Sequence, residues 1–257
     1  MHIVIFTGGE SPAPVDAAPY FACRAPDFVI AADSGLVTLE RYQECFDGFA
    51  PDLILGDMDS LGDKSLLRQY PADIVRTFMQ DKDATDTELA LEEAHRRASA
   101  DDWITLVGAS GGSRADHFLA VFDLFATALR PDCWLCGTQS FWYAGAGRSF
   151  SVGSLGLRDV VSVARTTASR TGGSLCSEGL LWEYDRFRTE GMPSVSNRIA
   201  PAHYERGKDV RVSVQEGDFV LILPLSARVR VHESPAVSKS TASEKDMSAT
   251  ASASNSP

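Results

Sequence analysis

Two carboxylates lie two residues apart in the segment Gly56-Asp57-Met58-Asp59, directly after an apolar run. In an extended chain this spacing points both side chains to one side. Carboxylates this close repel each other unless a cation lies between them, and Mg²⁺ accepts one or two carboxylates together with substrate phosphates. A solvated turn that precedes a helix is the alternative for this segment taken alone.

A second acidic loop follows the next apolar run and contains Asp83 and Asp86. Asp83 or Thr85 would also serve as the N-cap of a helix that starts there. Because the two acidic loops follow neighbouring strands of the predicted sheet, we favour a metal site that they share.

A glycine-rich loop at residues 108–117 ends where another helix is predicted to begin. Free backbone N–H groups at such a helix start favour an anion, and the guanidinium of Arg114 can bind a phosphate with two donors. Asp116 would anchor a substrate or cap its helix, and His117 would be a packed histidine or a proton carrier. The loop has neither Walker A nor dinucleotide-fold spacing, and the chain has no Gly-x-Ser-x-Gly motif.

These loops follow near-continuous apolar runs, which are typical of parallel strands buried on both faces. Helical patterns lie between the runs, and the clearest occupy residues 85–98 and about 116–129. Ligands bind beyond the carboxyl ends of parallel strands, where the loops above lie. The predicted strands are His2–Phe6, Phe28–Ala32, Leu53–Leu55, Ile74–Phe78, Trp103–Val107 and Cys133–Leu135.

After Gly145 the pattern changes to short alternating runs separated by Gly, Ser, Asp and Pro, which favours antiparallel strands. We therefore predict a doubly wound, Rossmann-like α/β domain at residues 1–145 and a β-sandwich or barrel at 146–235. Residues 236–257 are mostly Ser, Ala and Thr, and we expect a disordered tail. The predicted strands of the second half are Ser149–Val152, Val160–Ala164, Gly179–Tyr184, Val210–Val214, Phe219–Leu223 and Val229–Val231.

Charge and composition exclude several classes of function. The chain has a net charge of −11, and its acidity lies in the first half, where residues 1–145 hold 23 acidic and 10 basic side chains and so carry −13. An acidic protein of this kind does not suit a nucleic-acid polymer. No apolar run is long enough to cross a membrane, and the start lacks the features of a signal peptide.

The five cysteines are scattered, which argues against a disulfide scaffold and fits the cytoplasm. Cys133 and Cys136 are three residues apart in a predicted strand, so their side chains point to opposite faces. We interpret them as buried structural thiols.

Four segments in this order resemble the catalytic domain of the thiamine pyrophosphokinase family. They are Ala-Asp-Ser-Gly at 32–35, Pro-Asp-Leu-Ile-Leu-Gly-Asp-Met-Asp-Ser at 51–60, Lys-Asp-Ala-Thr-Asp-Thr-Glu-Leu-Ala-Leu at 82–91 and Gly-Ala-Ser-Gly-Gly-Ser-Arg-Ala-Asp-His at 108–117. The second and third are the most specific. The similarity continues through residues 179–182 and 194–197, so it covers roughly residues 1–235.

The resemblance implies Mg²⁺-dependent transfer of pyrophosphate from ATP to the hydroxyl of thiamine, which gives thiamine diphosphate and AMP. It also implies a homodimer in which the β domains complete each other's sites. The Mg²⁺ ligands would be Asp57, Asp59 and Asp86, and the catalytic set would add Asp83 and Asp116 to these three. The nucleotide would be bound by Asp33, Ser34, Gly35, Lys82, Gly111, Gly112 and Arg114, and thiamine by Trp182, Ser196 and Asn197.

The residues assigned to thiamine and those assigned to the triphosphate both have the chemical groups that this reaction needs. Trp182 can stack on a cationic heteroaromatic ring. Mg²⁺ with Lys82 and Arg114 can neutralise a triphosphate that the carboxylates alone would repel. Asp83 and Asp116 are the two candidates for orienting or deprotonating the attacking hydroxyl.

The chain departs from the family pattern in three places. Its glycine loop is one residue longer before Arg114, Leu181 replaces a basic residue ahead of the tryptophan, and Ser177-Glu178 stands where two threonines are common. The alternatives are a diphosphokinase for another alcohol such as a hydroxymethylpterin, a metal-dependent glycosyltransferase and a non-catalytic nucleotide sensor. The Trp182 and Ser196-Asn197 segments argue against the first, and the four ordered loops against the second. The sensor would lack reacting-centre carboxylates, which this chain has.

Overall fold

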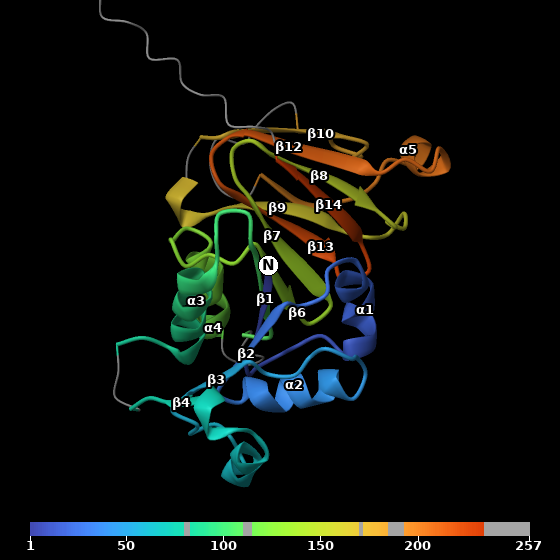
Figure 1. The fold of residues 1–257 in the computed structure, drawn as a ribbon. Helices are drawn as coiled ribbons and strands as arrows, with labels where there is room; N and C mark the ends of the chain where they lie inside the picture. The colour runs from blue at the N-terminus through green and yellow to red at the C-terminus, as the bar shows by residue number, and fades with distance from the viewer. Residues whose placement is uncertain (80–82, 110–114, 170–171, 185–192, 234–257) are drawn as a thin grey trace, which may run out of the picture.

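A computed structural model describes residues 1–79, 83–109, 115–169, 172–184 and 193–233. The chain forms a ten-stranded sheet in the order β11-β9-β13-β7-β6-β5-β1-β2-β3-β4 and a four-stranded sheet in the order β10-β12-β8-β14 (Figure 1). This confirms a mixed α/β fold with a large sheet that is mainly parallel and a separate antiparallel sheet.

The parallel part of the large sheet contains the six strands predicted for the first half. Except for the largely exposed edge strand β4, each is an apolar run without alternation, and every residue of β1 and β5 is buried, which explains the continuous hydrophobic pattern. The strands are β6 (Cys133–Cys136), β5 (Trp103–Val107), β1 (His2–Phe6), β2 (Phe28–Ala32), β3 (Leu53–Gly56) and β4 (Val75–Thr77).

Helices cover both faces of this parallel part, as a doubly wound sheet requires. α1 (Pro14–Cys23) and α2 (Gly35–Gln43) pack on one face, whereas α3 (Asp86–Arg97) and α4 (Ala115–Leu124) pack on the other (Figure 1). The predicted extension of the last helix to residue 129 is wrong. Phe125 and Ala126 donate to carbonyls three residues back, so the chain leaves the helix in turns.

The large sheet continues into the second half through antiparallel strands. β7 (Gln139–Ala144) forms a hairpin with β6 and is followed across the sheet by β13 (Phe219–Pro224), β9 (Val161–Arg165) and β11 (Ser194–Asn197). Antiparallel strands of the second half therefore extend the sheet of the first half.

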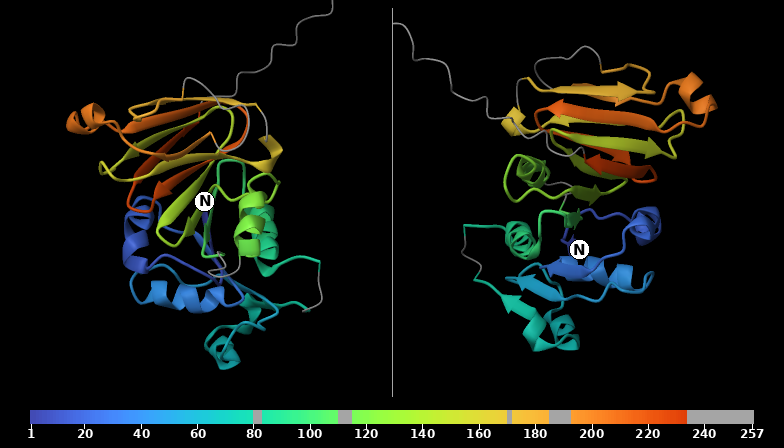
Figure 2. Two further views of the ribbon diagram at one scale, coloured as in Figure 1. Left: turned by 180° about the vertical axis from the view of Figure 1, so that it is seen from behind. Right: turned by 45° about the horizontal axis from the view of Figure 1, so that its top comes forward.

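The four-stranded sheet stacks on the antiparallel end of the large sheet (Figure 2). Its strands are β10 (Ser174–Glu178), β12 (Val210–Glu216), β8 (Arg148–Gly153) and β14 (Arg228–Glu233). Phe150 and Val212 of this sheet share one core with Trp142 and Leu221 of the large sheet and with the face under α1 and α2. Short elements complete the fold: η1 (Lys64–Gln69), η2 (Ala72–Ile74), η3 (Thr167–Ser169) and α5 (Pro201–Glu205).

The predicted strand at Gly179–Tyr184 is wrong. Apart from one bridge, Leu180 to Ile199, this segment is a turn. Gly179 has φ +97°, and the carboxylate of Glu183 accepts the backbone N–H groups of Gly179 and Leu180. These local bonds take the place of strand pairing.

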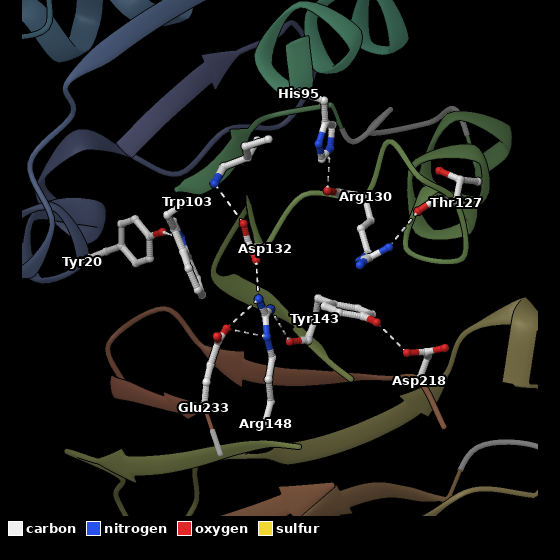
Figure 3. A network of polar contacts seen from close by, with 11 residues as sticks. Tyr20, His95, Trp103, Thr127, Arg130, Asp132, Tyr143, Arg148, Asp218 and Glu233 are labelled. Carbon is white, nitrogen blue, oxygen red and sulfur yellow. Dashed lines mark hydrogen bonds and ion pairs between the residues drawn. The ribbon is translucent and has the colours of Figure 1, made fainter. Parts of the chain in front are cut away.

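A polar network joins the two sheets (Figure 3). The guanidinium of Arg148 on β8 lies 3.0 Å from Asp132, which precedes β6, and 3.0 Å from Glu233 of β14. The ring of Tyr143 lies beside this guanidinium, and its hydroxyl donates to Asp218 at 2.5 Å. Burial and this carboxylate raise the pKa of Tyr143 to about 12.

The cysteines are all free thiols, and Cys133 and Cys136 are buried in the cores on opposite faces of the large sheet, as predicted. Among the described residues, no helix has both the length and the apolar character that a membrane span requires. The predicted tail at 236–257 lies outside the described residues.

Candidate active site

The loops after β1, β2, β3 and β5 lie at one edge of the large sheet, because these strands are parallel neighbours. Within the sheet, β2 lies next to β1 on one side, and β5, which comes later in the chain, lies next to β1 on the other side. This change of direction puts a topological switch point between β1 and β5, where open α/β sheets bind ligands.

Backbone segments approach each other closely at the switch point. The N–H of Ala109 donates to the carbonyl of Gly8 at 2.8 Å, and a Cβ added to Gly108 would lie 2.6 Å from the carbonyl oxygen of Thr7. A Cβ added to Gly8 would lie 2.2 Å from the hydroxyl of Ser34. The loop after β1 is thus part of the site, although sequence reasoning did not single it out; the Gly8-Gly9 pair directly after a buried strand was the available signal.

Three carboxylates converge at this edge. Oxygen atoms of Asp33, Asp57 and Asp59 all lie within 4.8 Å of one another, and this is the one group of potential metal ligands found among the described residues. Asp33 follows β2, whereas Asp57 and Asp59 follow the adjacent strand β3. The two acidic residues of the Asp-x-Asp segment therefore meet as predicted, but the third member of the group is Asp33.

The exposure of the three carboxylates differs. Asp33 is only 8% exposed and its Oδ1 is buried without a hydrogen-bond partner, whereas Asp57 is half-buried and Asp59 is exposed. The backbone N–H of Asp59 donates to Asp57 Oδ1 at 3.1 Å, and the hydroxyl of Ser60 donates to Asp59 Oδ1 at 2.9 Å. Hard oxygen donors around an unpartnered buried oxygen fit a divalent cation such as Mg²⁺.

Strained backbone holds these side chains in place. Asp33 has φ +48° and Met58 has φ +58°, a region that non-glycine residues seldom adopt. Met58 is 2% exposed, so it anchors the turn between the two carboxylates in the core. Ala109, with φ +60°, is a third such residue at this edge of the sheet. Strain of this kind is concentrated at functional sites.

The turn at Ser34 and Gly35 starts α2. A Cβ at Gly35 would lie 2.1 Å from the carbonyl oxygen of Phe6, so only glycine fits there. Ser34 is half-buried and precedes the helix without a side-chain cap. The structure therefore places Asp33, Ser34 and Gly35 beside the loop after β1, and their role toward a nucleotide remains a prediction.

The second acidic loop ends in a capping box. Thr85 accepts the N–H of Glu88 at 3.2 Å, and Glu88 accepts the N–H of Thr85 at 2.8 Å, so Thr85 is the N-cap of α3. Asp86 is the first residue of this helix and Asp83 is exposed ahead of it. Neither belongs to the group of three carboxylates, and their metal and catalytic roles remain predictions.

Several predicted nucleotide ligands cannot be placed, because Lys82, Gly111, Gly112 and Arg114 lie outside the described residues. Asp116 stands in the first turn of α4 and is exposed. His117 is exposed as well, so the interpretation as a packed histidine is wrong.

The predicted thiamine residues lie at the opposite end of the large sheet. Trp182 is 57% exposed, whereas Asn197 of β11 is fully buried and binds its backbone. Asn197 Nδ2 donates to the carbonyl of Trp182 at 2.8 Å, and Asn197 Oδ1 accepts the N–H of Trp182 at 3.2 Å. Ser196 has φ +61° and its N–H donates to the hydroxyl of Ser162. Asn197 thus positions the backbone of Trp182, and Ser196 precedes Asn197 in the same strand.

Comparisons with known proteins agree with this architecture. Residues 22–136 match the family model of the thiamin pyrophosphokinase catalytic domain. A search of curated protein sequences finds no match.

Solved structures are similar over most of the chain. A thiamine pyrophosphokinase from Bacillus subtilis is 22% identical with a TM-score of 0.66, covering 87% of this chain and 99% of that one. One from Geobacillus thermodenitrificans is 25% identical with a TM-score of 0.61, covering 87% and 97%. One from Candida albicans is 15% identical with a TM-score of 0.64, covering 87% and 88%. The family model thus supports, over residues 22–136, the family and the enzyme class predicted from the sequence, and the solved structures share the fold over most of the chain.

Proposed function

We propose that this chain, whose residues 22–136 belong to the thiamine pyrophosphokinase family, transfers pyrophosphate from ATP to the hydroxyl of thiamine. The products are thiamine diphosphate and AMP. The observation that carries the proposal is the convergence of three carboxylates beside the β1–β5 switch point, because a triphosphate brought there needs a cation between it and these oxygens.

Asp57 and Asp59 hold the cation, and a bound Mg²⁺ supplies positive charge to the phosphates of ATP. The loops after β1, β2 and β5 bring backbone close enough to cradle the nucleotide, with Asp33, Ser34 and Gly35 along its path. Lys82 and Arg114 complete the positive charge in this proposal, together with backbone N–H groups of Gly111 and Gly112. Asp83, Asp86 and Asp116 provide further carboxylates, and Asp83 or Asp116 orients or deprotonates the attacking hydroxyl.

Thiamine stacks on Trp182. Its ring is the most exposed aromatic side chain in the described part of the second half and is free to stack on a cationic ring, and Asn197 fixes its backbone. Ser196, exposed beside it, provides a hydroxyl for polar groups of the ligand.

The active form is a homodimer. Eight strand-to-strand steps separate β11, whose Asn197 binds the backbone of Trp182, from β3, which Asp57 follows. At about 4.8 Å a step this is roughly 38 Å, far beyond the reach of one thiamine molecule. Trp182 and the carboxylates of one chain therefore serve different sites, and each site is completed by a second copy. Exposed Leu181 and Val195 beside Trp182 give that interface apolar surface.

This proposal keeps residues 1–145 as the ATP- and Mg²⁺-binding catalytic domain and residues 146–235 as the thiamine-binding and dimerisation domain. The enzyme works in the cytoplasm, which fits its five free thiols. Neither a nucleic acid nor a membrane is its partner.

Consumption of ATP that depends on both thiamine and Mg²⁺ tests the proposal. The wild-type protein should consume ATP only when both are present. Asp57→Asn should abolish the reaction while the far-ultraviolet circular dichroism spectrum stays the same, because one hard oxygen charge is lost from the cation site. Near-normal rates for this variant would show that the carboxylate pair is only a turn. A hydroxymethylpterin in place of thiamine tests the second candidate, a diphosphokinase for another alcohol.

A further inference from the structure

We propose that Asp33 is the third carboxylate ligand of the divalent cation and that the backbone holds it in ligating position before the cation arrives. This inference deepens the proposed function, because the cation is the one that the proposed reaction needs. The family resemblance assigned Asp33 to the nucleotide and gave the third ligand position to Asp86.

The first ground is an unsatisfied buried oxygen. Asp33 Oδ1 is buried and has no hydrogen-bond partner, and Asp33 as a whole is only 8% exposed. An unpaired buried polar atom costs free energy, and a carboxylate costs more. The oxygens of Asp57 and Asp59 lie within 4.8 Å and add like charge. A cation between the three carboxylates removes both penalties at once.

The second ground is the way the backbone fixes the side chain. The N–H of Asp33 donates to the carbonyl of Leu55 at 2.8 Å, and its carbonyl accepts the N–H of Leu36 at 3.1 Å. Its φ of +48° is kept by these bonds on both sides. A Cβ added to Gly56 would lie 3.1 Å from Asp33 N, so the absence of a side chain at Gly56 brings Asp33 next to Asp57.

A role toward the nucleotide alone accounts for less of this geometry. A ribose hydroxyl could donate to Asp33 Oδ1, but it brings no positive charge to a group of three carboxylates whose oxygens lie within 4.8 Å of one another. Mg²⁺ bonds oxygen at about 2.1 Å, so pairs of its ligand oxygens lie roughly 3 to 4 Å apart. Small side-chain movements bring the three oxygens to that spacing.

Binding of Mn²⁺ to the nucleotide-free protein, followed by electron paramagnetic resonance, tests the proposal. Asp33→Asn keeps the side-chain shape, and asparagine tolerates the left-handed backbone. We expect the wild type to bind Mn²⁺ saturably, and Asp33→Asn and Asp57→Asn each to bind it at least about tenfold more weakly. Asp47→Asn, which removes one exposed charge in the turn after α2, should bind like the wild type.

Thermal unfolding supplies a second readout. Without metal, Asp33→Asn should have a melting temperature equal to or above that of the wild type, because a buried unpaired charge is gone, and Mn²⁺ should raise it less. The proposal is overturned if Asp33→Asn binds Mn²⁺ as tightly as the wild type, if the wild type shows no saturable binding, or if the metal-free variant is clearly less stable. If Asp33-dependent binding is found without thiamine diphosphate formation, only the proposed function fails.

Discussion

Asn197 holds the backbone of Trp182 from both sides, with its side-chain nitrogen 2.8 Å from the Trp182 carbonyl oxygen and its side-chain oxygen 3.2 Å from the Trp182 nitrogen. A fully buried amide thus orients a ring that is more than half exposed. An exposed aromatic ring fixed in this way is arranged for contact with another molecule.

Replacing Trp182 with Ala should chiefly raise the KM for thiamine, by about tenfold, because stacking on a cationic ring contributes about 1–2 kcal/mol. Phe at this position should restore part of the effect. Val15→Ala removes an exposed apolar side chain from α1 and should leave KM unchanged. Steady-state kinetics with thiamine varied would decide, and an unchanged KM for Trp182→Ala would move the thiamine site elsewhere.

Mixing two variants that are each impaired at a different site should restore activity if sites are shared between chains. Asp57→Asn damages the cation site and Trp182→Ala the thiamine site, so a hybrid dimer contains one intact site. After unfolding and refolding together, the mixture should reach about a quarter of wild-type activity at subsaturating thiamine, because half of the dimers are hybrids. Activity no higher than the mean of the separate variants would contradict a shared site.

Arg148→Met should lower the free energy of unfolding by about 1–3 kcal/mol, because it leaves the largely buried carboxylate of Asp132, together with the exposed Glu233, without their shared cation. Urea unfolding measures this loss. Arg228→Met breaks an exposed ion pair with Asp209 and should change stability by no more than about 0.5 kcal/mol. Equal effects of the two variants would show that the network between the sheets adds no special stability.

His2 should make the fold less stable in acid. It is buried, with its ring nitrogens 3.0 Å from Ala25 O and 2.8 Å from Thr105 Oγ1, and burial lowers its pKa from 6.5 to about 4. The unfolded chain binds this proton more readily, so stability is complete above pH 6.5 and falls as the pH drops toward 4. The loss reaches about 3 kcal/mol at most.

Urea unfolding of the wild type and of His2→Gln between pH 7.5 and pH 4.5 would isolate this term. The stability difference between the two proteins should shift in favour of His2→Gln as the pH falls. A difference that is the same at every pH would show that His2 does not titrate differently in the folded and unfolded chains.

Gly56→Ala should weaken the cation site. The new Cβ would lie about 3.1 Å from the backbone nitrogen of Asp33, at a φ of +141°, so Asp33 must move away. Gly48 has φ +85° with no atom within 4 Å, which makes Gly48→Ala a control for backbone strain alone. Both variants should lose about 1 kcal/mol or more of stability, but only Gly56→Ala should lose Mn²⁺ affinity. Equal Mn²⁺ affinity in both would contradict the role given to Gly56.

The sequence predicted the parallel strands well, because strands buried on both faces are continuous apolar runs. It did not predict β7, which forms a hairpin with β6 and also pairs with β13 some eighty residues further along the chain, nor β10 and β11. The pattern at 179–184 predicts a strand, because most of its residues are apolar or aromatic. The segment is a turn instead, because the carboxylate of Glu183 accepts backbone N–H groups at its start.

The site was predicted in part. Asp57 and Asp59 meet because they follow one strand, which spacing alone reveals. The contact with Asp33 depends on the pairing of β2 with β3 and on the close approach at Gly56, neither of which a linear pattern contains. The positioning role of Asn197 likewise comes from a bond across 15 residues.

Identification of the products by mass spectrometry tests the central claim most directly. Purified protein incubated with ATP, thiamine and Mg²⁺ should form thiamine diphosphate and AMP in equal amounts, with the β- and γ-phosphates of ATP both transferred. Formation of ADP with thiamine monophosphate, or no thiamine product at all, would contradict it.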